Sequence, residues 1–431
     1  MTLRRSLGLT HATAMVVGTI IGASIFVQPS EITRQMPSVA GILFVWLAAG
    51  ALTLCGALIC AELASAYPET GGVYVFLRES WSPAVGFLWG WAMIWSMHSG
   101  IIAAIATVFA RYAAVFVPMS AWQLRLVAVT VIVILSGINY VGVRHGGLVQ
   151  NVFTASKLAA IVAVIGAGLA WSGAAPVHAA ASAAVAPRAF LLAMAAGLFA
   201  YGGWHMVTYA AGETRDPARV IPRALLMGTL VVTACYAGLN AIYLRVLPLD
   251  AVRQSSHVAA DAADVLLGGG GAKLMAALVM VSTFGAVNGI ILVGPRVYYS
   301  MANDGLLFRW LGAVHPRFGT PARAIVVQAV WASVLALTNT YGALFSRVIY
   351  TEWIFFAILA AGLLRLRRRP DYRPAYRLWG SPVVPLIFIA ASLLVVVMQM
   401  TASLQDSLMG LGMVVAGLPV YFFWSSRQRR T

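Results

Sequence analysis

Three small residues, Gly22, Ala23 and Ser24, interrupt the apolar stretch at residues 15–27. A helix broken here inside a bilayer leaves backbone N–H and C=O groups unpaired, which is costly unless protein, an ion or a polar ligand pairs with them. The new helix N-terminus directs positive charge at a carboxylate, and carbonyl oxygens of the preceding turn accept from an ammonium group. The pattern therefore predicts a site for a zwitterion, although a glycine kink between packed helices uses the same residues.

A second interrupted stretch, at residues 197–213, again places adjacent glycines among aromatic residues. Corresponding breaks in two halves of a chain indicate an inverted-repeat transporter with its site near the bilayer midplane. His205 directly follows the second pair of glycines. Its imidazole could titrate or contact a substrate side chain, and a hydrogen-bonded packing histidine is the alternative.

Three further polar side chains fall at membrane depth. Lys157 lies six to eight residues inside a predicted span, where it either snorkels to the surface or places a cation beside the first break. Glu352 is a functional candidate because intramembrane carboxylates are rare, and the alternative is a local pair with Arg347 or hydrogen bonds to Tyr350 and Trp353. Asn288 either lines a cavity or supports close helix packing. We also expect Glu213 to form an ordinary ion pair at the membrane interface.

The composition is that of a polytopic membrane protein. Of the 431 residues 61% are hydrophobic and 10% charged, and the mean hydropathy is +0.86, which excludes an ordinary soluble domain. Apolar runs of about 20 residues predict twelve helices and therefore both chain ends on one side. The predicted helices are 10–34, 38–66, 83–113, 121–141, 149–172, 188–211, 221–246, 273–301, 323–340, 344–366, 382–402 and 407–425.

The net charge of +16 is unevenly distributed along the chain. Most arginines, including the cluster at residues 365–377, fall in segments that are cytoplasmic if the N-terminus is cytoplasmic. This distribution follows the positive-inside rule and predicts a multi-pass protein of the cell membrane, inner or plasma, with both termini in the cytoplasm. The lipid bilayer, rather than nucleic acid, is then the partner of the basic surface.

The sequence provides little for covalent catalysis. The cysteines are Cys55, Cys60 and Cys235, and all lie in predicted helices. Their spacing matches neither a disulfide framework nor a metal site. We expect no metal, no cofactor and no enzymatic activity, because the polar residues at membrane depth are too scattered for converging acid and base groups. A channel is disfavoured too, since a pore needs several polar stripes.

Several stretches together resemble the amino acid–polyamine–organocation transporters, and most closely the bacterial relatives of L-type amino acid transporters. The stretches are GTIIGASIF, AELASAYPETGGVYVFLRE, FTASK, FAYGGW with GETRDPARVIPRAL, FGAVNG, and RRRPDYRPAYRLWG. The resemblance covers residues 7–385. It implies an all-α fold of twelve transmembrane helices with a LeuT-type five-plus-five inverted repeat, in which helices 1 and 6 are broken. A single transporter domain, 1–431, would hold repeats at 10–172 and 188–366 and two additional helices within 382–425.

The resemblance also implies how a substrate is held. The substrate carboxylate would bind the amides of Gly22, Ala23 and Ser24. The substrate ammonium would bind the carbonyls of Ile20, Phe199, Ala200 and Gly202. Phe199 would cover the site, Trp204 would shape the side-chain pocket, and Lys157 matches the lysine that replaces sodium in sodium-independent members. This chain departs from the family pattern at Ser24, where a glycine is usual, which leaves pocket size open.

These observations predict a sodium-independent carrier of neutral L-amino acids that works by alternating access, an exchanger by resemblance. Neither broken segment contains a carboxylate or spare arginine for a charged side chain. Two alternatives remain open: a proton-coupled symporter using Lys157, Glu352 or His205, and a carrier of cationic amino acids or polyamines using Glu352. We expect an amino acid as the small-molecule ligand and no obligatory subunit.

Overall fold

The computed structural model describes residues 7–173, 176, 185–339, 341–402 and 404–428, and all the regular elements in this part of the chain are helices. The helices are α1 (Leu9–Ile20), α2 (Ser24–Gln35), α3 (Val39–Ala66), α4 (Val73–Ser80), α5 (Pro83–Ala92), η1 (Met93–Met97), α6 (His98–Ala113), α7 (Ala121–Val141), α8 (Val143–Ala170), α9 (Pro187–Ala200), η2 (Trp204–Glu213), α10 (Pro217–Val246), α11 (Leu249–Gln254), α12 (Val258–Leu267), α13 (Gly271–Asn303), η3 (Arg309–Gly312), α14 (Ala322–Thr338), α15 (Tyr341–Leu366), α16 (Val383–Ala402), α17 (Leu404–Val415) and α18 (Gly417–Gln428).

Local sequence explains many of these boundaries. Ser38 and Ser82 accept hydrogen bonds from the amides of the first turns of α3 and α5, as N-capping residues do. Ser120 and Gln123 form a reciprocal capping box at the start of α7. The π-helical η1 continues α5 into α6, so the predicted span 83–113 is one long helix with a π segment in its middle.

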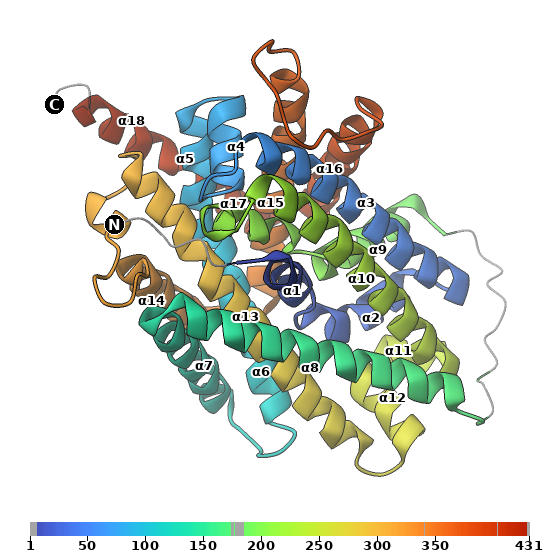
Figure 1. Cartoon of the computed structure of the whole chain (residues 1–431). Coiled ribbons are helices and arrows are strands. Elements are labelled where there is room, and N and C mark those ends of the chain that lie inside the picture. The colour runs from blue at the N-terminus through green and yellow to red at the C-terminus, as the bar shows by residue number, and fades with distance from the viewer. Residues whose placement is uncertain (1–6, 174–175, 177–184, 340, 403, 429–431) are drawn as a thin grey trace.

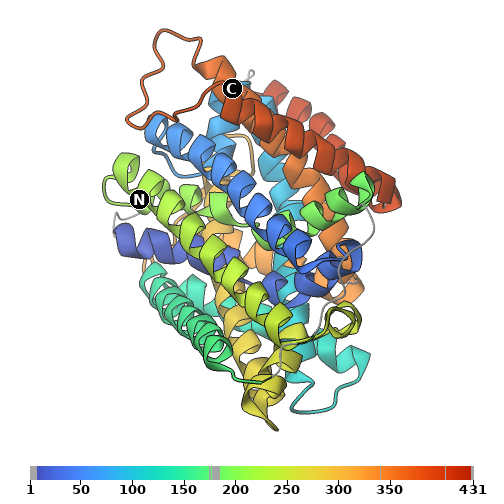
Figure 2. The ribbon, with the colours of Figure 1, turned by 90° about the vertical axis from the view of Figure 1, so that its right-hand side faces the viewer.

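The first broken helix lies at the centre of the molecule. Figure 1 shows α1 in the middle of the bundle, where it packs against α8, α10, α13 and η2. Figure 2 shows α3 between α10 and α16, the three running in a similar direction, and α10 is the one of them that packs most closely against α1. The buried side chains form one continuous hydrophobic core that includes both chain breaks. The outer helices face away from this core with exposed leucine, valine and phenylalanine side chains, as lipid-facing surfaces do.

Nine described helices are long and apolar enough to cross a membrane, and ten if the bent pair α1 and α2 forms one span. This establishes a multi-pass membrane protein. The count of twelve stays a prediction, because α14 is a shorter apolar helix and α15 does not qualify among the described residues. The inverted repeat also stays a prediction. The prediction that both termini are cytoplasmic falls on residues 1–6 and 429–431, which lie outside the described residues, so it also stays a prediction.

Candidate functional site

The first chain break lies where the sequence predicts it. α1 ends at Ile20, α2 begins at Ser24, and the two helix axes differ in direction by 44°. The amide of Gly22 turns back to donate to the Ile20 carbonyl at 2.8 Å. The first amides of a helix lack an intrahelical acceptor, so the start of α2 directs the N–H groups around Ala23 and Ser24 at the break.

The second break touches the first. α9 ends at Ala200, and the 3₁₀ helix η2 begins at Trp204. Gly203, between them, has φ of +104°, and a Cβ atom there would lie 2.8 Å from the Thr19 carbonyl oxygen. The Thr19 hydroxyl donates to the Gly203 carbonyl at 3.1 Å. Only glycine fits this backbone conformation and this approach, so the break holds the two segments together.

Lys157 closes the end of α1. Its ammonium nitrogen lies 3.1 Å from the carbonyl oxygen of Gly18, in the final turn, and 2.6 Å from that of Ile21, the residue after the helix. It also lies 3.2 Å from the carbonyl oxygen of Ser282 on α13. The side chain is 2% exposed, so the snorkelling alternative is wrong. A buried cation thus satisfies helix-end carbonyls at the negative end of the helix dipole.

Sequence reasoning did not identify Tyr236, which binds both breaks. Its hydroxyl, from α10, lies 3.0 Å from the Ile20 carbonyl oxygen and 3.1 Å from that of Ala200. These are two of the four carbonyls that the resemblance assigns to a substrate ammonium. A hydroxyl donates one proton, so it can satisfy one of them at a time. In the sequence Tyr236 is marked only as an aromatic residue with a hydroxyl group at the depth of the breaks. Nothing in the sequence shows which groups this hydroxyl contacts.

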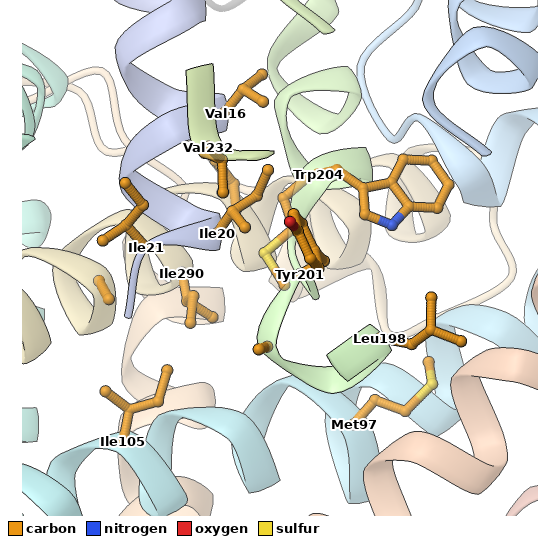
Figure 3. Packing of buried hydrophobic residues seen from close by; sticks show 14 of the residues in the cluster. Val16, Ile20, Ile21, Met97, Ile105, Leu198, Tyr201, Trp204, Val232 and Ile290 are labelled. Atoms are coloured by element: carbon orange, nitrogen blue, oxygen red, sulfur yellow. The ribbon is translucent and has the colours of Figure 1, made fainter. Parts of the chain in front are cut away.

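A small, partly open cavity lies between the breaks. Its volume is about 40 Å³, room for roughly three water molecules. Most of the wall is apolar, and Figure 3 shows five of its residues: Ile20, Leu198, Trp204, Ile105 and Ile290.

The predicted site residues separate into two groups. The cavity wall includes Ile20, Gly22, Ser24, Phe199, Gly202, Trp204 and Glu352. Ala23 and Ala200 are buried beside the wall, and Lys157 lies behind the end of α1. The wall also includes Trp353 and Phe356, which sequence reasoning did not select.

Asn288 does not line the cavity. Its amide nitrogen donates to the Gly146 carbonyl at 3.0 Å and to Gln150 Oε1 at 3.2 Å. Its amide oxygen accepts from Asn139 at 2.9 Å. Asn288 therefore joins α7, α8 and α13, in agreement with the packing alternative.

Glu352 and His205 form a close pair at the cavity wall. Glu352 Oε1 lies 4.0 Å from His205 Nε2, and both side chains are buried. The packing alternative for His205 requires a hydrogen bond, yet neither ring nitrogen has a hydrogen-bond partner among the described residues. The side chain of Arg347, the alternative partner of Glu352, lies outside the described residues.

The end of η2 away from the cavity is fastened by a buried ion pair. Arg296 Nε of α13 lies 2.6 Å from Glu213 Oε1, and each side chain is 2% exposed. The prediction of an ordinary ion pair at the membrane interface is therefore wrong for Glu213, because η2 turns the Glu213 carboxylate into the protein interior. The Leu7 amide donates to the Glu213 carbonyl at 2.9 Å, and the Arg215 amide donates to the Leu7 carbonyl at 2.8 Å. These contacts hold the end of η2 against α13 and against the segment that precedes α1.

The short helix α4 lies at the same end. Its Tyr74 hydroxyl donates to Asp304 Oδ2 at 2.6 Å, and Arg78 pairs with the same carboxylate. Burial raises the pKa of Tyr74, and the hydrogen bond and charge of Asp304 raise it further. Tyr74 therefore stays neutral and keeps its proton for this hydrogen bond.

Comparisons with known proteins show which family of proteins the sequence of this chain resembles. The family model described as amino acid permease matches residues 7–418. The serine/threonine exchanger SteT of Bacillus subtilis (strain 168) is 33% identical, over 99% of this chain and 98% of that protein. The human b(0,+)-type amino acid transporter 1 is 30% identical, over 98% of this chain and 88% of that protein. The human large neutral amino acids transporter small subunit 2 is 31% identical, over 99% of this chain and 82% of that protein.

Proposed function

The chain belongs to the amino acid permease family of the amino acid–polyamine–organocation superfamily, close to the L-type transporters, and on that premise we propose that it exchanges small neutral L-amino acids without sodium. It is a membrane transporter of amino acids, not an enzyme. One observation carries the proposal: two chain breaks meet at a small apolar cavity, with the Lys157 ammonium bound to the carbonyls at the end of α1.

Sodium independence rests on Lys157. A sodium ion beside the first break would need oxygen ligands, and the carbonyls of Gly18 and Ile21 are the oxygens at this helix end. The ammonium group already binds both, at 3.1 and 2.6 Å, and supplies the positive charge. A second cation there would meet electrostatic repulsion and find few free oxygens.

The two ends of a zwitterion fit opposite sides of the breaks. The carboxylate would accept from the amides at the start of α2, where Gly22 contributes less because its amide donates to Ile20. The ammonium would donate to the carbonyls of Ile20, Phe199, Ala200 and Gly202. Its binding would compete with the Tyr236 hydroxyl, which contacts two of these oxygens.

The cavity favours a short side chain. About 40 Å³ has room for few atoms, and the wall is mostly isoleucine, leucine and aromatic side chains. The Ser24 side chain, where the family usually has glycine, takes up part of the space. Serine and threonine, the amino acids in the name of the B. subtilis relative, are of this size class.

A second candidate is a carrier of cationic amino acids or polyamines. It is favoured by one observation, since the Glu352 carboxylate lines the cavity and Oε1 has no hydrogen-bond partner among the described residues. A cationic side chain would neutralise this carboxylate. The small volume argues for the neutral substrate, because a long side chain needs more room than the cavity offers.

The proposal extends to organisation and location. Alternating access would use the repeats at 10–172 and 188–366, with both termini in the cytoplasm and the chain in the cell membrane. The chain would act without an obligatory subunit, although the name of one human relative describes a small subunit.

Counterflow into proteoliposomes tests the substrate and the ion. Vesicles loaded with unlabelled L-serine should take up labelled L-serine equally with sodium or choline outside. Unlabelled L-threonine should compete, whereas D-serine, L-arginine and putrescine should not. Vesicles without internal amino acid are the control for exchange. A requirement for sodium contradicts the role of Lys157, and competition by arginine or putrescine alone selects the second candidate.

A further inference from the structure

A second polar region lies next to the cavity, on the side of the fastened end of η2. We call it the inner polar cluster, and it consists of Glu352 of α15, His205 and Tyr209 of η2, His98 of α6 and Gln328 of α14. Each of these residues is buried, and the side chain of Glu352, the most exposed of them, is 7% exposed. The cluster begins at the cavity wall with Glu352 and follows η2 away from it.

Aromatic rings enclose the first pair of the cluster. The His205 ring lies 5.3 Å from the Trp204 ring, 5.8 Å from that of Trp89 and 4.9 Å from that of Phe356. Among the described residues, His205 is the one basic side chain with a nitrogen within 4.0 Å of a Glu352 carboxylate oxygen. The aromatic rings thus shield the pair from bulk water.

The next members continue the cluster away from the cavity. The Tyr209 ring lies 5.6 Å from that of His205 and 5.7 Å from that of His98, so it bridges the two histidines. His98 Nδ1 and Gln328 Oε1 lie 2.7 and 2.3 Å from the position that a Cβ of Gly294 would occupy. The absence of a side chain at Gly294 therefore leaves the space in which the imidazole and the amide approach each other.

The cluster has more polar atoms than hydrogen bonds. Both ring nitrogens of His98, both of His205, both amide atoms of Gln328 and Glu352 Oε1 have no hydrogen-bond partner among the described residues. An unpaired buried polar group destabilises the folded state, so stability alone does not explain several in one place. Such a group of donors and acceptors suits a ligand that can both donate and accept, which protons and water do.

We propose that Glu352 and His205 form a proton-binding site in the wall of the substrate cavity, which ordered water connects past Tyr209 to His98 and Gln328. This inference rests on the proposed transport function and deepens it, because amino acid binding and proton binding then share one wall. Among the described residues, the buried Cys60 thiol of α3 and the buried Tyr298 hydroxyl of α13 also act electrostatically on Tyr209.

The proton balance of the step is simple. At 4.0 Å the carboxyl group and the imidazole are too far apart for a direct hydrogen bond, so one bridging water carries the transfer. The proton that leaves Glu352 binds His205 Nε2, which gives a carboxylate and an imidazolium of zero net charge together. His205 then releases it through water toward His98, and the site becomes an anion until a new proton arrives.

Infrared difference spectroscopy tests the site on the purified full chain. We expect addition of L-serine to change the carbonyl stretch of a protonated carboxylic acid in the wild type. Glu352→Gln should abolish this signal. Glu31→Gln is the matched control, because the Glu31 side chain is 47% exposed and lies outside the cluster, and it should keep the signal. If Glu352→Gln does not fold, His205→Gln takes its place and should also lose the signal.

Proton movement in proteoliposomes tests the connection to His98. In vesicles loaded with L-serine and more alkaline inside than outside, a pH-sensitive dye inside should report acidification that starts when L-serine is added outside and exchange begins, with the membrane potential clamped. His98→Asn should keep L-serine counterflow and lose this pH change, whereas the exposed His11→Gln should keep both.

Three results would overturn the inference. An infrared signal that persists in Glu352→Gln excludes Glu352 as the proton carrier. A wild type that exchanges L-serine with neither an infrared signal nor a pH change refutes proton binding and leaves the proposed exchange intact. A wild type that neither binds nor exchanges any amino acid overturns the proposed function as well.

Discussion

Substitution of Lys157 by methionine should weaken substrate binding strongly. Methionine keeps much of the length of the side chain but donates no hydrogen bond, so the Gly18 carbonyl loses the partner at 3.1 Å. The Ile21 carbonyl keeps only the Ser282 hydroxyl at 3.5 Å. An orphaned buried carbonyl costs about 1–3 kcal/mol, and a cation at a helix C-terminus contributes up to about 2 kcal/mol.

One term opposes this loss. A buried ammonium group has a desolvation penalty that methionine avoids, and a buried charge replaced by an apolar group is sometimes neutral for stability. We therefore expect the arrangement of the first break to be destabilised by about 2–3 kcal/mol. At about 1.4 kcal/mol per tenfold change, substrate binding weakens roughly 30- to 150-fold.

The assay is thermal stabilisation of the purified protein by increasing L-serine, from which Kd follows. The chain's other lysine provides a matched control, because Lys273 is exposed at the start of α13. Lys273→Met should bind like the wild type. If Lys157→Met also binds within about threefold of the wild type, less than about 0.7 kcal/mol, the ammonium does not hold the break and the reasoning fails.

Three further predictions follow from the site. Tyr236→Phe removes the hydroxyl shared by the two breaks and should weaken L-serine binding about tenfold, whereas Tyr243→Phe on the same helix, whose hydroxyl has no partner among the described residues, should not. Gly203→Ala should lower the thermal unfolding temperature through about 1–3 kcal/mol of backbone strain, and Gly269→Ala, with open space around it, should not; equal temperatures would refute the close approach. Ser24→Gly should enlarge the cavity, so L-leucine should compete better with L-serine in counterflow, and an unchanged competition profile would contradict the role of this side chain.

Both breaks could be predicted from the sequence because they depend on local signals. Glycine and small residues inside an apolar span indicate a break, and the structure ends α1 and α9 next to these residues. The placement of Lys157 was also accessible, since a lysine at membrane depth has few places where its charge is tolerated. These features depend on residue type and depth, which a linear sequence contains.

The partners of the site depend on helix packing and were not accessible. Tyr236 resembles any tyrosine of a long apolar helix until α10 packs against α1 and α9. His98 and Gln328 lie 230 residues apart in sequence, and they meet only because neither is blocked by a side chain at Gly294. The sequence identified Glu352 as a candidate, but its proximity to His205 depends on how α15 and η2 pack, which the sequence does not show.

The π-helical segment Met93–Met97 indicates how this helix evolved. Such a segment contains one residue more than the α-helix it replaces, so it is equivalent to a single-residue insertion in an ancestral helix. Deletion of one residue here would restore a regular helix and rotate α5 by about 100° relative to α6. Trp89 would then leave its place beside His205, while His98 kept its own. Insertions and deletions at this point should therefore be rare among functional descendants, even though the segment lies outside both chain breaks.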